Sequence, residues 1–245
     1  MLRFLKVGDI IVTMTQKETA MYKYQLHIHT TPCSRCGTLT PETLCLALLE
    51  NGFSGGVITD HFYHGNSGID RSEKTTWETF VSAYEKNYLE FKKEAEKHGL
   101  DIIFSIEESL EPGIEVLCYG ITPKILYDNP QLMNGDKHEW VRVMRENGVV
   151  IIQAHPYREA SYIPNPGPLP LDMIDGVEVY NGGNTNEMNE KAQRLAKSHL
   201  HLIKTSSADA HKASTVALGG IETKGRIKTE KDLARILKSG AYRLL

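Results

Sequence analysis

The chain of 245 residues lacks long apolar runs. No stretch reaches the roughly 18 consecutive apolar residues that a membrane-spanning helix requires. The N-terminus also lacks the charged and then apolar pattern of a secretory signal. We therefore expect a cytoplasmic protein that does not bind membranes.

Cysteine and net charge are both low. The cysteines are Cys33, Cys36, Cys45 and Cys118, which fits a reducing compartment rather than a disulfide framework. The 28 Lys and Arg residues against 31 Asp and Glu residues give a net charge of −3. This balance argues against general nucleic-acid binding, so a phosphorylated ligand would have to be attracted locally, for example by metal ions. The sequence gives no prediction of the oligomeric state.

The chain also lacks internal repeats and linker-like changes in composition. From Met21 onward, short apolar runs alternate with amphipathic segments such as residues 76–97, and Thr40 and Thr229 stand where helix caps are expected. This alternation predicts a single α/β domain over residues 21–245, most simply a closed or distorted (β/α) barrel of parallel strands. Residues 1–20 are expected to be a leader, either a loose arm or an edge strand, with a short strand at 9–13.

Metal-binding types of side chain occur where the predicted strands end. They are His27, His29, Asp60, His61, Glu107, His155, Asp209 and His211. Active sites of parallel α/β folds are built at this edge, and imidazoles at alternate positions of a strand share one face. We therefore expect these side chains to converge on metal ions. The pair His199-x-His201 lies at a helix end and a strand start, so it is predicted to lie outside the site.

These residues resemble the motifs of the PHP (polymerase and histidinol phosphatase) superfamily. The resemblance covers Tyr22 to the C-terminus and depends on five segments, namely His27-x-His29, Thr59-Asp60-His61, Ile106-Glu107, Ala154-His155-Pro156 and Ser207-Ala208-Asp209-Ala210-His211. It implies a distorted seven-stranded (β/α) barrel that carries two or three divalent ions, such as zinc, manganese or iron, and hydrolyses phosphate esters.

The resemblance also implies ligand sets. The ligands of one ion correspond to His27, His29, Glu107 and Asp209. Glu107 would bridge to a second ion that His155 also holds, and His61 with His211 would bind a third.

Two positions depart from the family pattern. Cys36, before Gly37, stands where the family usually has an Asp, and Glu115 stands where it commonly has a His. Both can bind metal, the thiolate preferring softer ions such as zinc and the carboxylate preferring harder ones. The alternative for Cys36 is that it only packs the loop.

The chemistry follows from the ligand types. Clustered divalent ions acidify water and neutralise phosphate oxygens, so we expect a metal-bound hydroxide to attack a small phosphate monoester, either a phosphorylated metabolite or a nucleotide. His61 or His211 is the candidate proton donor to the leaving group. Arg158 is a candidate phosphate contact, with a solvated loop charge as the alternative.

Two other classes of function are open. A metal-dependent amidohydrolase also uses a His-x-His pair after its first strand, but it would not need the ligands after the second and third strands. A non-catalytic zinc module could be built on Cys33-x-x-Cys36 and a histidine, which would leave the other strand-end residues unexplained.

Overall fold

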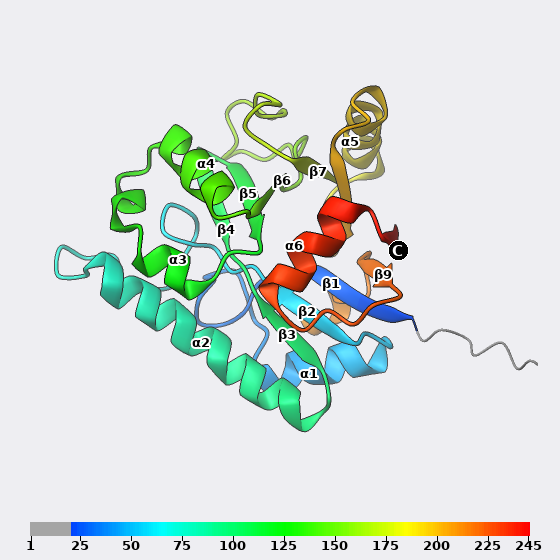
Figure 1. The fold of residues 1–245 in the computed structure, drawn as a ribbon, viewed down its shortest axis with the longest axis horizontal. Helices are drawn as coiled ribbons and strands as arrows, with labels where there is room; N and C mark the ends of the chain where they lie inside the picture. Colours follow the sequence, from blue (N-terminus) through cyan, green and yellow to red (C-terminus); the bar gives the residue numbers. More distant parts are fainter. Residues whose placement is uncertain (1–20) are drawn as a thin grey trace, which may run out of the picture.

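The computed structural model describes residues 21–245, whose strands form two five-stranded sheets (Figure 1). The first sheet has the order β10 (Tyr242–Leu244), β9 (Ile221–Thr223), β1 (Tyr22–Ile28), β2 (Gly55–Ile58) and β3 (Asp101–Phe104). The second has the order β4 (Glu107–Glu111), β5 (Ile114–Tyr119), β6 (Val150–Gln153), β7 (Gly176–Asn181) and β8 (Ile203–Ser207). The leader and strand predicted within residues 1–20 lie outside the described part of the chain.

The prediction of a single α/β domain is confirmed, but the closed form of the predicted barrel is wrong for the described residues. Between the two sheets the described residues form isolated β-bridges, such as Ile28 with Ala210 and His61 with Glu107, and no continuous ladder of strand pairs. β1, β2 and β3 are parallel, as are β6, β7 and β8, but β5 is antiparallel to both β4 and β6. The tight turn at Pro112-Gly113 explains the antiparallel β4–β5 pair, because a parallel connection needs a crossover of about a dozen residues.

The helices lie around the two sheets (Figure 1). They are α1 (Pro41–Glu50), α2 (Trp77–Lys97), α3 (Pro123–Tyr127), α4 (Lys137–Glu146), α5 (Asn186–Ser198) and α6 (Glu230–Ser239), with 3₁₀ segments η1 (Pro130–Asn134) and η2 (Ala213–Thr215). The caps predicted at Thr40 and Thr229 are confirmed, since each side chain accepts a bond from a backbone N–H of the first turn, and Thr76 caps α2 in the same way. The short elements α3, η1, β9 and β10 were not predicted.

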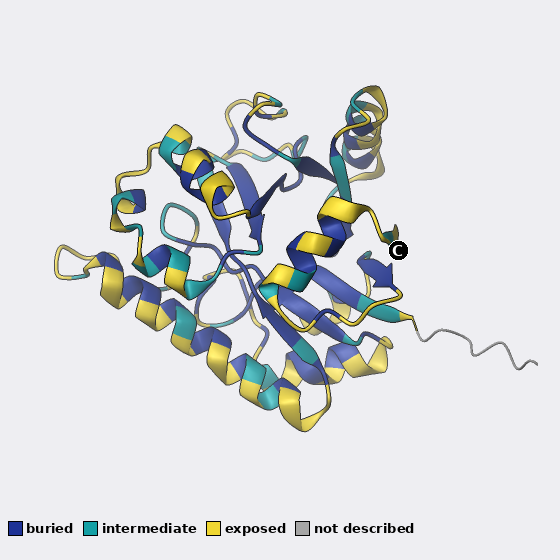
Figure 2. Ribbon diagram, in the orientation of Figure 1, coloured by how far each residue is buried: buried dark blue, intermediate teal, exposed yellow. Residues whose placement is uncertain are grey.

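Apolar side chains from both sheets meet in an inner core that α6 covers. Leu26 of β1, Val57 of β2 and Ile152 of β6 belong to one buried cluster with Leu233 and Leu237 of α6. In Figure 2 the side of α6 that faces the strands is buried and its outer side is exposed. The two sheets are therefore held together by packing, although their strands do not close into a barrel. Within residues 21–245, no helix is long and apolar enough to cross a membrane.

Candidate metal centre

The candidate ligands gather along one edge of the two sheets. His29, His61, His155 and Asp209 all lie just past the ends of the parallel strands β1, β2, β6 and β8. Glu107 does not end the third strand as expected, because β3 stops at Phe104 and Glu107 opens β4. The start of the antiparallel strand β5 lies at the same edge, which explains how Glu115 reaches the group. His27 lies within β1, beside its end.

Glu107 lies at the middle of the group. Its Oε1 is 3.1 Å from His27 Nε2 and 3.3 Å from His155 Nε2, and its Oε2 is 2.9 Å from His61 Nδ1 and 3.3 Å from His29 Nε2. One carboxylate therefore faces four imidazoles. Glu115 adds a second carboxylate, with Oε1 3.3 Å from His61 Nδ1.

Asp209 completes the group around the His-x-His pair. Its Oδ1 is 3.1 Å from His29 Nε2 and 3.4 Å from His27 Nε2. The two Nε2 atoms are themselves 2.9 Å apart. Two imidazole nitrogens brought this close to each other and to carboxylates are the arrangement expected around a shared cation.

The buried atoms of the group fit a metal ion better than an ordinary polar core. Both oxygens of Glu107, Oδ1 of Asp209 and Nδ1 of His61 are buried, yet none has a hydrogen-bond partner among the described residues. Burying such groups without a partner is costly, and nearly all buried polar atoms find one. One ligand atom from each of His27, His29 and Glu107 lies within 4.8 Å of the others, and the same is true of His61, Glu107 and Glu115. The residue set therefore fits divalent ions.

Charge in this centre is strongly coupled. Burial opposes the charged forms of Glu107 and Asp209, but the facing imidazoles hold the pKa of both carboxyls well below the usual range. Burial also opposes charge on His27, but Asp209, Glu107 and Glu178 raise its pKa well above the usual value. In contrast, burial and the nearby His61 lower the pKa of His29 to about 3. The carboxylates are thus ready to bind cations at neutral pH.

Two of the candidate ligands have an unusual backbone. His155 has φ of 30° and Asp209 has φ of 52°, a region that residues other than glycine rarely adopt. Such conformations cost about 1–3 kcal/mol and persist where the surrounding structure imposes them. Both side chains point into the same group, so the strain accompanies the placement of the ligands.

Glu178 supports the centre and was missed by the sequence analysis. This fully buried carboxylate accepts from His27 Nδ1 at 3.0 Å through Oε1, and from the backbone N–H of His155 at 2.9 Å through Oε2. Asn181 Nδ2 donates to the same Oε2 at 2.7 Å. A bond of this kind fixes the imidazole with its Nε2 lone pair toward the ion. The signal in the sequence was an acidic residue between Val177 and Val179 in an apolar strand.

Asp60 supports His29 through Ser34. Ser34 Oγ donates to Asp60 Oδ1 at 2.6 Å and lies 3.0 Å from His29 Nδ1. Because the hydroxyl proton is given to Asp60, Ser34 accepts from His29, which leaves the Nε2 lone pair of His29 facing the centre. Asp60 is therefore a supporting residue in this structure, although its position at a strand end was predicted. Burial raises the pKa of its carboxyl to about 6, against the hydrogen bonds from Ser34 and Thr30.

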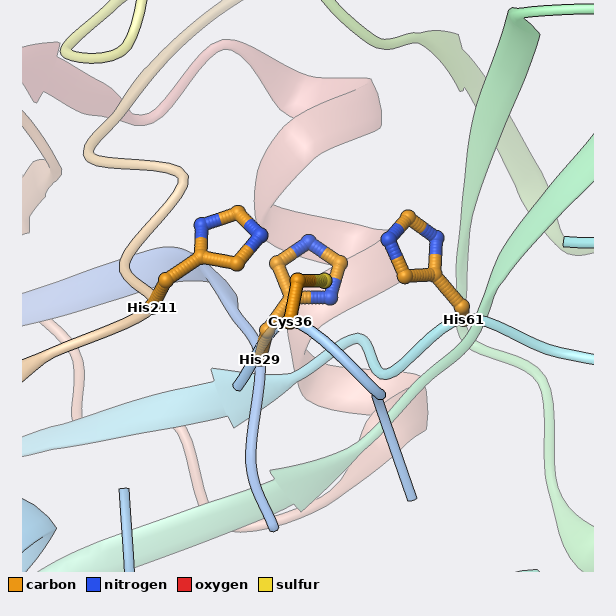
Figure 3. A group of neighbouring side chains, drawn as sticks. All are labelled: His29, Cys36, His61 and His211. Atoms are coloured by element: carbon orange, nitrogen blue, oxygen red, sulfur yellow. The ribbon is translucent and has the colours of Figure 1, made fainter. Parts of the chain in front are cut away.

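Cys36 lies at the exposed side of the centre with three imidazoles. The nitrogens of His29, His61 and His211 and the Cys36 sulfur all lie within 4.8 Å of one another, and Figure 3 shows the sulfur between His61 and His211. Burial opposes ionisation of Cys36, but hydrogen bonds with His211 and His61 lower the pKa of its thiol to about 6. At Gly37 a Cβ would come within 2.8 Å of the Thr30 carbonyl oxygen, so glycine allows this loop to lie against the end of β1.

A cavity of about 610 Å³ opens onto the centre, and its volume suits a small ligand. It is lined by candidate ligands and by Arg158 and Tyr162. Arg158 Nη2 is 2.7 Å from Asp209 Oδ2 and also donates to Asn181 Oδ1 at 2.9 Å, while Nε donates to Asn184. Arg158 is thus fixed against a candidate ligand instead of being a free loop charge.

Other residues singled out in the sequence lie elsewhere. His199 Nδ1 donates to the Leu195 carbonyl and His201 is exposed, and neither belongs to a group of described side chains that could hold an ion. Cys33 is buried in the core and takes no part in the groups that could hold an ion, so the described residues give no support to a zinc module on Cys33-x-x-Cys36.

Comparison with known proteins places the chain in a family. A family model described as PHP domain matches residues 25–212, and a second, described as PHP-associated, matches residues 186–242. The chain belongs to the PHP domain family. No curated protein matches it significantly.

Solved structures share its fold. A protein described as a candidate metal-dependent phosphoesterase from Bifidobacterium adolescentis aligns with a TM-score of 0.54 at 17% identity, over 87% of this chain and 95% of that one. PsfC from Pseudomonas syringae aligns with a TM-score of 0.61 at 14% identity, over 86% and 87%. The lesion-specific endonuclease PfuEndoQ from Pyrococcus furiosus aligns with a TM-score of 0.52 at 14% identity, over 92% of this chain and 58% of that one.

Proposed function

We propose that the chain is a metal-dependent phosphoesterase that hydrolyses a small phosphate monoester, such as a phosphorylated metabolite or a nucleotide. The observation that carries the proposal is the set of buried Glu107 and Asp209 oxygens that face imidazoles without hydrogen-bond partners in the described residues, beside a cavity of ligand size. Family membership and the similarity to a candidate phosphoesterase support it.

Each residue has a distinct part in this proposal. His27, His29, Glu107 and Asp209 would hold one ion, and Glu107 with His155 and Glu115 would hold a second. Divalent ions at such a centre supply acidified water and positive charge for the phosphate oxygens.

Arg158 would bind a phosphate oxygen. Its Nε and Nη2 are bonded to protein oxygens, whereas Nη1 makes no bond within residues 21–245, and the side chain lines the cavity. A guanidinium fixed in this way can offer a donor to the phosphate without having to be ordered first.

His211 can play one of two roles, and each role excludes the other. Its Nδ1 is 2.8 Å from the Asp209 carbonyl oxygen, to which it donates, so only Nε2 is available toward the cavity. That atom either binds an ion or carries the proton for the leaving group, because a lone pair bound to a cation cannot hold a proton. His61 has the same two roles open to its Nε2, the ring nitrogen that does not face Glu107 and Glu115, and it too can play only one of them.

The test is hydrolysis by the full chain after loading with Mn²⁺, Zn²⁺ or Fe²⁺. We expect release of nitrophenol from p-nitrophenyl phosphate, loss of that activity with a chelator and recovery when metal is restored. Bis(p-nitrophenyl) phosphate probes diester cleavage of the nuclease kind, and p-nitroacetanilide probes the amidohydrolase alternative. Hydrolysis of the amide alone, or of no phosphate ester with any of the ions, would contradict the proposal.

A further inference from the structure

Cys36 brings a sulfur atom into a group of candidate ligands that are otherwise imidazoles and carboxylates. Figure 3 shows its sulfur among the rings of His29, His61 and His211, which come from three separate segments of the chain. The rings pack closely, with centroid distances of 4.4 Å from His29 to His61 and 4.3 Å from His29 to His211. The group is therefore built by the fold and not by neighbouring residues in the sequence.

Each neighbouring imidazole is already oriented toward the sulfur. In His211, Nδ1 is occupied by the Asp209 carbonyl, so Nε2 faces Cys36. In His61, Nδ1 lies 2.9 Å from Glu107 Oε2 and 3.3 Å from Glu115 Oε1, and the other ring nitrogen points toward Cys36. One ring nitrogen bonded to a carbonyl and the other left free is the usual form of a metal-binding histidine, and His211 has this form. His61 also turns its second nitrogen toward Cys36, but its Nδ1 lies beside the carboxylates without a hydrogen bond.

His29 belongs to the neighbouring ion rather than to this group. Its Nε2 is 2.9 Å from His27 Nε2 and 3.1 Å from Asp209 Oδ1, and one nitrogen lone pair binds only one ion. The group at the cavity then has three protein ligands, one sulfur and two nitrogens. Sites with three protein ligands and an open fourth position are of the catalytic kind.

We propose that Cys36 Sγ, His61 and His211 form a soft, zinc-selective site that differs chemically from the oxygen-rich sites around Glu107, so that the loaded protein carries two kinds of ion. Thiolate ligands favour zinc, whereas carboxylates favour harder ions such as Mn²⁺. The inference rests on the proposed metal centre and deepens it by dividing its ions into two classes. It also assigns His61 and His211 as ligands, which removes them as proton donors to the leaving group.

The experiment follows the sulfur by its spectrum, independently of activity. Cobalt(II) bound to a thiolate gives an intense near-ultraviolet charge-transfer band that imidazole and carboxylate ligands do not give. We expect this band in the full chain loaded with Co²⁺, and its loss in Cys36→Ala and Cys36→Asp. The matched control is Cys45→Ala, because Cys45 is a buried thiol on α1 away from the group, and it should retain the band.

Metal content and preference give the second readout. Cys36→Ala should lose one metal equivalent, while Cys36→Asp should keep it and lower the preference for zinc over manganese by on the order of tenfold or more. Circular dichroism of each variant checks that it is folded, and Cys36→Asp keeps the test valid if Cys36→Ala is not. A wild-type cobalt protein without the band, or a Cys36→Ala protein with full metal content and an unchanged zinc preference, would overturn the inference.

The two proposals fail in different ways. Hydrolysis of p-nitrophenyl phosphate without a thiolate band would retain the phosphoesterase and remove Cys36 from the centre. A thiolate band without hydrolysis of any phosphate ester would retain the soft site and remove the proposed activity.

Discussion

The chain contains two His-x-His pairs with the same spacing and opposite surroundings. His27 and His29 are buried, and their Nε2 atoms are 2.9 Å apart among carboxylates. His199 closes α5, where its Nδ1 donates to the Leu195 carbonyl, and His201 is exposed before β8 begins. The spacing alone therefore says little, and the position at the carboxyl end of a strand decides whether two imidazoles converge.

The strongest test of this comparison replaces histidines at both edges of the sheets. His29→Ala and His155→Ala should each lower kcat/KM by at least about a hundredfold, because each removes a ligand that positions an ion. His201→Ala should leave activity unchanged. Steady-state kinetics with p-nitrophenyl phosphate measure all three variants, and similar kinetics for the three would break the distinction between the edges.

The sequence analysis predicted which side chains gather better than it predicted how the strands pair. Strand ends can be read from apolar runs, so the gathering of His29, His155 and Asp209 follows from local signals. The closing of the sheet cannot be read in this way, because it depends on how strands far apart in the sequence pair. The antiparallel β4–β5 pair that interrupts the barrel was therefore not predicted.

The supporting residues were not predicted for a related reason. Glu178 lies inside a strand and Ser34 in a loop, and neither has a spacing that marks it. Their roles arise from tertiary contacts, because Glu178 binds His27 across 151 residues of sequence and Ser34 links His29 to Asp60, 26 residues further along the chain. A buried charge in an apolar strand is the local signal that could have identified Glu178.

A second prediction sharpens the comparison through Glu178, which fixes His27, whereas His199 is held only by its own helix. Glu178→Gln should lower metal affinity about ten- to a hundredfold, because supporting partners of this kind tune a ligand without binding the ion. Titration with a competing chelator measures the effect. Glu190→Gln, on the exposed face of α5, is the matched control and should bind metal as the unmodified chain does. An affinity unchanged in Glu178→Gln would show that His27 needs no such support.

A third prediction concerns the thiols of the metal-free protein. Cys36 should react with iodoacetamide with half-maximal rate near pH 6, because bonds with His211 and His61 offset the burial that opposes its ionisation and lower its pKa to about 6. At pH 7 the gain over an ordinary thiol should be only a few-fold, since a less basic thiolate is also a weaker nucleophile. Burial raises the pKa of Cys45 to about 11, so Cys45 should react far more slowly.

Mass spectrometry of the modified peptides checks this prediction. In His211→Ala the midpoint should move to higher pH, because one hydrogen bond to the thiolate is lost. Bound metal should slow the modification of Cys36. Equal pH profiles for Cys36 and Cys45 would show that His61 and His211 do not lower the pKa of the Cys36 thiol.

The smallest effect is expected at the opposite edge, where buried polar contacts support the fold alone. The Tyr24 hydroxyl donates to Asp101 Oδ2 at 2.9 Å and accepts from the backbone N–H of Ile227, also at 2.9 Å, while the ion pair of Asp101 with the exposed Arg226 adds little. Asp101→Ala leaves the buried hydroxyl proton without its acceptor, so we expect a loss of about 1–3 kcal/mol in the free energy of unfolding. Thermal unfolding should show a Tm lower by about 2–4 °C per kcal/mol for a domain of this size.

The exposed Asp172, as Asp172→Ala, is the control for loss of a carboxylate, and neither variant should change kcat/KM or metal content. A loss of activity in folded Asp101→Ala protein would mean that the two edges are coupled and that the division between them is wrong.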